Sequence, residues 1–125
     1  MFYKEPNTQD RRRLRRQNLS YYLQIVDPDT LQIVGHLVDI NRIGLMIDSS
    51  NPLSVGRDYR LRLDTTPEVA DKTCLNFIAR VRWCRPDKIE PTVFNIGFEL
   101  TSITAHDLEI IQRIVDVYGT KAKPY

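Results

Sequence analysis

The chain has 125 residues, which is enough for one domain with a single hydrophobic core. Hydrophobic residues make up 42% of it and charged residues 27%, as in an ordinary soluble globular protein. No apolar run approaches the ~20 residues needed to cross a bilayer. The first residues lack the basic start and apolar core of a signal peptide, so we expect a cytoplasmic protein without membrane insertion.

The net charge of +2 is unevenly distributed along the chain. Residues 1–16 hold six positive and two negative side chains and carry +4, which leaves −2 for the remaining residues. A mildly acidic body with a basic N-terminal segment favours a local anion site. It argues against a broad nucleic-acid surface, because such domains are usually more basic, so we consider nucleic acid an unlikely partner.

Residues 1–10 are polar and without periodicity, and we expect a mobile tail there. Six strands are then predicted from β-branched, aromatic or alternating composition. Asp27–Thr30 has the Pro and Asp of a turn and makes the first two strands a hairpin. The predicted strands are 21–26, 33–40, 45–47, 59–63, 77–83 and 94–100.

Alternation also predicts which side chains face the core. The inward faces of the fifth and sixth strands are Phe77, Ala79, Val81 and Trp83, and Phe94, Ile96, Phe98 and Leu100. The outward positions carry charges that we expect to be solvated: Arg60, Arg62, Arg80 and Arg82. Cys74 and Cys84 lie at the ends of one extended run, about 33 Å apart at about 3.3 Å per residue, so they cannot pair with each other.

The last element changes period from two to 3.6. Thr104 is the expected N-cap, Asp107 suits the first helical turn, and Gly119 is the expected stop. The apolar stripe is Leu108, Ile111, Val115 and Tyr118, widened by Ile110, Ile114 and Val117. The order predicts a mainly β fold, a six-stranded antiparallel barrel with one C-terminal helix across an opening. The predicted divisions are tail 1–10, single domain 11–119 (arm 11–20, barrel 21–100, helix 104–118) and tail 120–125.

Five arginines stand in six positions just ahead of the first strand: Arg11, Arg12, Arg13, Arg15 and Arg16. A guanidinium grips a phosphate or a guanine edge through two parallel hydrogen bonds, and it can stack on a purine face. Neighbouring cations repel one another without an anion, so we expect this arm to stay flexible until something neutralises it.

The turn Asp39–Gly44 supplies the complementary groups. The carboxylate of Asp39 can accept from guanine N1–H and N2–H₂, or cap the turn through backbone N–H groups. The amide of Asn41 can donate to a phosphate oxygen or a guanine atom, and Arg42 adds a cation. Gly44 permits a positive φ or close approach of a ligand, or is a plain turn glycine. With the arm, this turn predicts a site for a small, doubly charged, guanine-bearing ligand.

In the order and spacing of the arginine cluster and this turn, the chain resembles the PilZ domain family. The motifs of that family are R-x-x-x-R followed by (D/N)-x-S-x-x-G at the start of a β-barrel. Arg12 and Arg16 fit the first motif best, and Arg11 and Arg15 fit its bare pattern equally well. The second motif is matched at Asp39, Asn41 and Gly44, with Asn41 where the family usually has Ser. The segment 96–100 and the C-terminal helix are also similar, so the resemblance spans roughly residues 10 to 118.

The resemblance implies a receptor for the bacterial second messenger cyclic di-GMP, with no cofactor and no catalytic activity. Arg12, Arg16, Asp39, Asn41 and Gly44 would be its main ligand-binding residues. The helpers would be Arg11, Arg13, Arg15 and Arg42. Ligand binding would order the arm, and the protein would act in trans on a separate, unidentified protein, in a family that commonly concerns motility, biofilm or pili.

Two alternatives remain open at this point. The first is a PilZ-like interaction module that binds no nucleotide, which the Asn41 departure motivates. The second is a small nucleic-acid-binding barrel that uses the arm as an electrostatic anchor. Metal and nucleophilic sites are not expected, because the two histidines and two cysteines lack zinc spacing and no glycine-rich phosphate loop or G-x-S-x-G motif is present.

Overall fold

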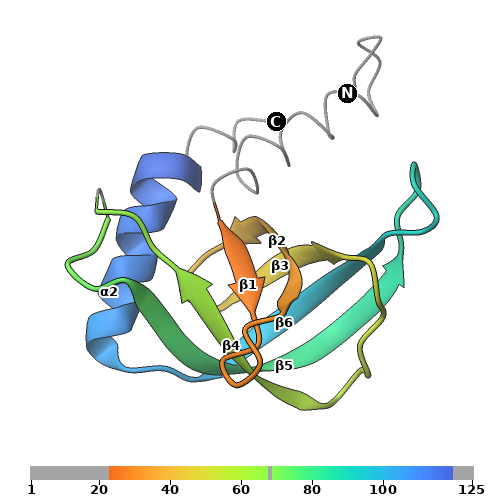
Figure 1. Ribbon diagram of the computed structural model, residues 1–125, viewed down its shortest axis with the longest axis horizontal. Coiled ribbons are helices and arrows are strands. Elements are labelled where there is room, and N and C mark those ends of the chain that lie inside the picture. Colours follow the sequence, from red (N-terminus) through yellow and green to blue (C-terminus); the bar gives the residue numbers. More distant parts are fainter. Residues whose placement is uncertain (1–22, 68, 120–125) are drawn as a thin grey trace, which may run out of the picture.

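The computed structural model describes residues 23–67 and 69–119 and is drawn in Figure 1. The arginine cluster, the two predicted tails and residues 21 and 22 of the first predicted strand lie outside the described residues. The strands are β1 (Gln24–Val26), β2 (Ile33–Ile40), β3 (Gly44–Ser49), β4 (Asp58–Asp64), β5 (Cys74–Pro86) and β6 (Phe94–Ser102). They are followed by the helix α2 (Ala105–Ile114) and a π-helical turn η1 (Val115–Gly119).

The six strands form one closed barrel in the order β1-β2-β3-β6-β5-β4, and every pair is antiparallel. The barrel closes between β1 and β4 through two residue pairs, Ile25 with Leu63 and Val26 with Arg62. The predicted six-stranded antiparallel barrel with one C-terminal helix is therefore confirmed. The bounds of β2 are those expected from the sequence, whereas β5 is longer than the predicted 77–83 because its pairing with β4 and β6 extends at both ends.

Every second side chain along a strand points into the barrel, and these side chains form the core. The innermost are less than 2% exposed: Leu23, Ile25, Leu37, Ile47, Leu61, Leu63, Leu75 and Ile96. The predicted inward face of β6 is also confirmed, because Ile96 and Phe98 are buried and Phe94 and Leu100 pack against the core.

The helix α2 packs against one end of the barrel (Figure 1). It begins after Thr104, whose hydroxyl accepts a hydrogen bond from the backbone N–H of Asp107 at 3.1 Å, so the predicted N-cap is confirmed. Ile110, Ile111 and Ile114 are fully buried in the core, whereas Leu108 is only half-buried. The three buried isoleucines all belong to the predicted apolar stripe, and Val115 and Val117 pack against the core beside them.

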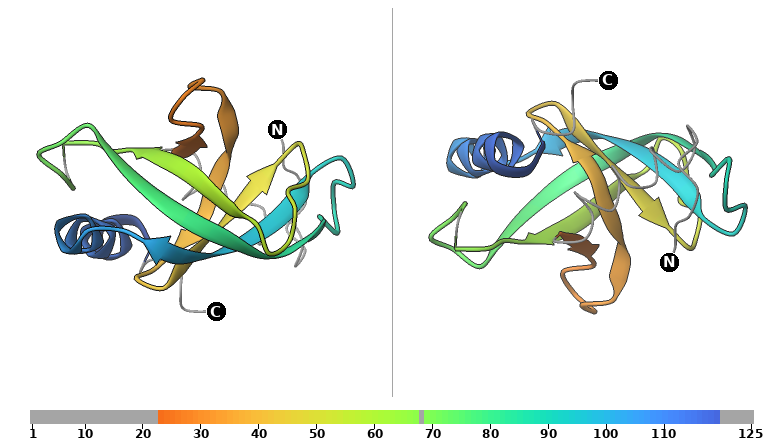
Figure 2. Two further views of the ribbon diagram at one scale, coloured as in Figure 1. Left: turned by 90° about the horizontal axis from the view of Figure 1, so that it is seen from below. Right: turned by 90° about the horizontal axis from the view of Figure 1, so that it is seen from above.

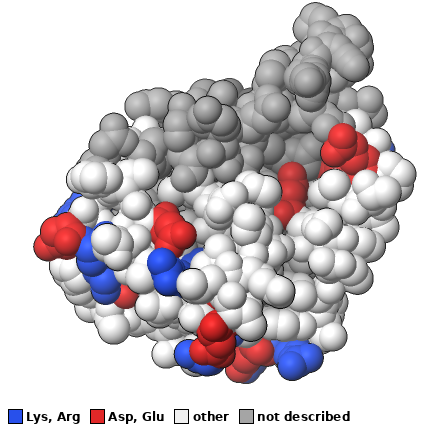
Figure 3. Space-filling model, viewed as in Figure 1, with Lys and Arg blue, Asp and Glu red and all other residues white. Residues whose placement is uncertain are grey.

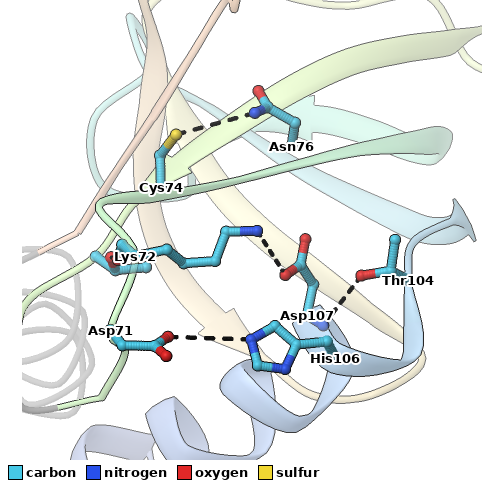
Figure 4. Close-up of polar contacts among 8 residues, drawn as sticks. Asp71, Lys72, Cys74, Asn76, Thr104, His106 and Asp107 are labelled. Atoms are coloured by element: carbon cyan, nitrogen blue, oxygen red, sulfur yellow. Dashed lines mark hydrogen bonds and ion pairs between the residues drawn. The ribbon is translucent and has the colours of Figure 1, made fainter.

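The loop between β4 and β5 is tied to this helix (Figure 4). Lys72 Nζ donates to the buried carboxylate of Asp107 at 3.0 Å, and Arg113 donates to the carbonyl of buried Val69 at 3.0 Å. His106 Nε2 lies 4.0 Å from the Asp71 carboxylate. Pairing with Lys72 explains how Asp107 can occupy the apolar side of the helix.

The strand arginines are paired with acids: Arg60 with Asp29, Arg62 with Asp64, Arg80 with Asp58 and Arg82 with Glu99. On the face in Figure 3, positive and negative side chains lie beside one another and do not form patches of one sign. Both cysteines are half-buried and free, in agreement with the prediction that they do not pair with each other. None of the helices in the described part of the chain is long and apolar enough to cross a membrane.

Candidate functional site

The turn between β2 and β3 is held by a single side-chain oxygen. Asn41 Oδ1 accepts from the backbone N–H groups of Ile43 at 2.7 Å and Gly44 at 3.0 Å. The backbone N–H of Asn41 donates to the carbonyl of Gly44 at 2.9 Å, which completes the turn. Only the oxygen of an amide can accept from these groups, so the Nδ2 donor of this exposed residue takes no part in the turn.

Gly44 is needed for a reason that the sequence does not reveal. Its φ is not positive, so that part of the prediction was wrong. A Cβ atom at this position would lie 2.1 Å from the carbonyl oxygen of Phe98, on the neighbouring strand β6. Glycine therefore permits β3 and β6 to approach each other beside the turn.

Two register shifts redirect side chains out of the barrel beside this turn. In β2 the shift lies between Leu37 and Asp39, and in β5 it lies between Val81 and Trp83. Each adds one residue to its strand, so the alternation of faces is reset beyond it. Asp39 and Trp83 consequently face outward, although strict alternation from Leu37 and Val81 would turn both inward.

The predicted inward position of Trp83 was therefore wrong. Phe77, Ala79 and Val81 are buried as expected, but beyond the shift it is Cys84 that packs against the core. The Trp83 indole lies on Gly97, because a Cβ at Gly97 would come within 2.2 to 2.7 Å of three ring atoms.

Asp39 and Trp83 are the two ends of one row of residues across four strands. Asp39 pairs with Met46, Met46 with Gly97, and Gly97 with Trp83. At about 4.8 Å per strand, the row spans roughly 14 Å of the outer surface. The structure thus brings together residues that are far apart in the sequence.

An open pocket of about 370 Å³ lies along this row. It is lined by Asp39, Asn41 and Gly44 of the predicted site, and also by Met46, Arg82 and Trp83, which the sequence analysis did not select. The sequence does contain a signal for the outward position of Trp83. It is an aromatic residue near a strand end, with a glycine in a later strand against which its ring can pack.

Charged side chains line the pocket at Asp39 and Arg82, and two further arginines lie near it in the sequence or in space. Asp39 is half-buried, and its Oδ1 accepts from the backbone N–H of Ile40 at 2.9 Å. Arg82 lies 3.2 Å from Glu99 in a solvent-exposed pair, and such pairs are worth only about 0–1 kcal/mol. Arg82 can therefore turn toward an anion at little cost. Arg42 is exposed on the turn itself, and the guanidinium of Arg85 lies 4.3 Å from the Trp83 ring centroid.

The predicted arm residues Arg11, Arg12, Arg13, Arg15 and Arg16 lie outside the described residues. The described part of the chain begins at Leu23, whose carbonyl accepts from the backbone N–H of Leu37 at 3.1 Å. Leu37 stands two residues before Asp39 in β2. Among the described residues, no group of three His, Cys, Asp or Glu side chains could hold a metal ion.

Together these features define a small closed barrel with a terminal helix and an open polar and aromatic pocket on its outer surface. The PilZ domain model matches residues 9–116, so the chain belongs to the PilZ domain family.

Among solved structures, the chain is similar to the Bacillus subtilis inhibitor of motility MotI/DgrA, with a TM-score of 0.61 and 20% sequence identity. The match covers 82% of this chain and 48% of that one, so this chain spans about half the length of MotI/DgrA. At this identity the likeness concerns the fold alone. No curated protein matches the chain.

Proposed function

We propose that this protein is a receptor for cyclic di-GMP and that the pocket along the Asp39–Trp83 row is its binding site. The observation that carries the proposal is the row itself. It places a carboxylate at one end, an aromatic ring at the other and an exposed arginine beside them. A ligand with two guanines and two phosphates can use all three kinds of group.

Each described group has a role in this proposal. Asp39 accepts from guanine N1–H and N2–H₂, and a purine stacks on Trp83 in place of the Arg85 guanidinium, which lies 4.3 Å from the ring centroid. Arg82 exchanges its weak pair with Glu99 for a charge-assisted bond to phosphate. No cofactor takes part, and the module binds and does not catalyse.

Asn41 supports binding despite its departure from the family's Ser. Its oxygen closes the turn with two backbone N–H groups, as a Ser hydroxyl oxygen would. The amide keeps a donor that the turn does not use and that can reach a phosphate oxygen or a guanine atom.

The arm supplies the remaining cations, with Arg12 and Arg16 as the principal phosphate ligands and Arg11, Arg13 and Arg15 as helpers. Neutralisation by the ligand orders the arm across the barrel, and the new surface acts in trans on a separate protein in the cytoplasm. MotI/DgrA is described as an inhibitor of motility, which makes motility the first output to examine.

Calorimetric titration of cyclic di-GMP, with GTP as the control ligand, tests the proposal. We expect binding at micromolar concentration or tighter, and a loss of about 10- to 100-fold in Trp83→Ala or Arg16→Ala, since base stacking and charged hydrogen bonds contribute about 1–3 kcal/mol each. Arg80→Ala is the matched control, because Arg80 pairs with Asp58 and does not line the pocket. Absence of binding to the full chain would refute the receptor.

A second candidate is a protein-interaction module that binds no nucleotide. Ile43 favours it, because this side chain is 75% exposed at the lip of the same pocket. Ile43→Asp would then abolish capture of a partner from a lysate while the calorimeter shows no nucleotide binding. The nucleic-acid alternative is less well supported, because the four strand arginines already pair with acids.

A further inference from the structure

The outer face of the Trp83 indole is covered by a cation. The inner face of the ring lies against β6, where it occupies the place that a Cβ atom of Gly97 would take. The guanidinium of Arg85 lies 4.3 Å from the ring centroid. A guanidinium does not fit between the ring and the strand, so Arg85 lies on the face that is turned to solvent. A purine that stacks on Trp83 therefore competes with Arg85 for the same surface.

The register shift in β5 brings the two side chains together. Trp83 and Arg85 stand two residues apart beyond the shift, so both point outward, whereas Cys84 between them packs against the core. They lie near the end of β5, beside the turn to β6 that projects away from α2 in both views of Figure 2. Arg85 is exposed, so its side chain can leave the ring without disturbing the barrel.

Arg85 differs from the four strand arginines that pair with acids. Among the residues that the structure describes, no carboxylate lies within ion-pair distance of Arg85, and its guanidinium contacts the ring. The acid in the same row of the sheet is Asp48, which accepts from the buried amide of Asn95 at 2.7 Å. The aromatic face is thus what holds Arg85, and an anion that offers charge-assisted hydrogen bonds can draw it away.

We propose that Arg85 makes this pocket select a purine that carries a phosphate over a purine that does not. The proposal rests on the nucleotide site proposed above and states how that site discriminates. In the empty protein the guanidinium closes the outer face of Trp83. A nucleotide replaces both partners of this contact, since its base takes the ring and its phosphate takes the guanidinium. A nucleoside takes the ring but leaves Arg85 without a partner, so it binds weakly.

Quenching of Trp83 fluorescence by acrylamide tests the contact in the empty protein, because Trp83 is the single tryptophan of the chain. Arg85→Ala should raise the quenching constant, since the solvent-facing side of the ring is uncovered. Lys88→Ala is the matched control: Lys88 is exposed in the turn that follows β5, so this variant removes the same charge and leaves the ring covered. Equal quenching constants in the two variants would overturn the inference, whatever the pocket binds.

Titrations followed by the indole N–H signal of Trp83 in NMR spectra test the selectivity. The unaltered chain should bind cyclic di-GMP much more tightly than guanosine. In Arg85→Ala the affinity for guanosine should rise about two- to fivefold, because the competing cation is gone. The affinity for cyclic di-GMP should not rise, because a charged hydrogen bond is lost as well. The ratio of the two affinities should therefore fall by about tenfold or more, and an unchanged ratio contradicts the selectivity.

Arg85→Lys separates the cover from the charge. An ammonium group keeps the charge for a phosphate but lacks the plane that lies on an indole. The affinity for guanosine should rise as in Arg85→Ala, while that for cyclic di-GMP should stay within about threefold of the unaltered chain. Failure of the receptor gives a different result, because cyclic di-GMP would then not bind to the unaltered chain although Arg85→Ala is still quenched more strongly. That result would refute the nucleotide site and, with it, the selectivity.

Discussion

The turns at the two ends of β2 use the same device with different chemistry. In each, one side-chain oxygen accepts from two backbone N–H groups: Asp27 at the hairpin tip and Asn41 at the candidate site. The distances agree within 0.1 Å, at 2.7 and 3.1 Å in one turn and 2.7 and 3.0 Å in the other. What remains of the side chain differs, since Asp27 keeps a second charged acceptor and Asn41 keeps a donor. The turn needs only the oxygen, so the rest of the side chain is available for function.

Asn41→Asp gives the site turn the chemistry of the hairpin turn and should have the largest effect. The turn should persist, but a negative charge would replace the amide donor, and we expect at least about a hundredfold loss of cyclic di-GMP affinity. Asn41→Ser should stay within about threefold of the unaltered chain, because a hydroxyl both closes the turn and donates. Calorimetry of the two variants side by side provides the measurement. Equal affinity of Asn41→Asp and the unaltered chain would show that the amide donor plays no part.

Gly44→Ala addresses the packing of the site turn. The added methyl group would meet the carbonyl of Phe98 at 2.1 Å, so strands must separate, at a cost of about 1–3 kcal/mol in the free energy of unfolding. Urea denaturation measures this loss. Gly56→Ala is a useful contrast, because a Cβ there meets nothing within 4 Å and only the positive φ of +87° is strained. If Gly44→Ala were as stable as the unaltered chain, the close approach to β6 would not be what requires glycine.

Leu31→Gly makes the opposite change at the hairpin tip. A leucine in the left-handed region costs about 1–2 kcal/mol, and the extra chain entropy of glycine in the unfolded state offsets part of the gain. We expect a net stabilisation of roughly 0–1 kcal/mol, visible as an unchanged or slightly higher melting temperature. A marked fall in melting temperature would mean that the Leu31 side chain stabilises the fold through contacts within the chain, contrary to its exposure.

The smallest effect concerns acid. Hydrogen bonds from the backbone N–H of Thr30, and then of Asp29, hold the pKa of Asp27 below its ordinary value of 3.8. The contribution of the Asp27 carboxylate to the free energy of unfolding is therefore complete at a pH above its ordinary pKa. It is lost as the pH falls through the lower pKa of the folded state. Asp27→Asn should flatten this part of the acid limb of a stability curve while leaving stability at neutral pH nearly unchanged. Asn41, an amide, contributes no such dependence, so Asn41→Ser should leave the limb as it was.

The sequence allowed the strands to be placed because alternation is a local property. It predicted β2 to the residue and the Thr104 cap of α2, since both depend on neighbours within a few positions. It also selected the Asp39–Gly44 turn. The outward position of Trp83 was missed, because a register shift depends on how many residues the partner strand offers, which no local pattern records. The requirement for glycine at position 44 was missed for a similar reason. The group that a Cβ there would meet is the carbonyl of Phe98, in a strand that is distant in the sequence.

The way the barrel closes has a consequence for where the protein opens locally. Among the described residues, β1 pairs with β4 only through Ile25 and Val26, so this junction is where local opening breaks the fewest strand pairs of the described barrel. The chain that precedes it bears the arginine cluster. Any ligand that anchors the cluster to the Asp39–Trp83 row therefore also holds β1 in place, and occupancy of the pocket should slow amide hydrogen exchange in β1 and in the Arg62–Leu63 segment more than elsewhere in the barrel.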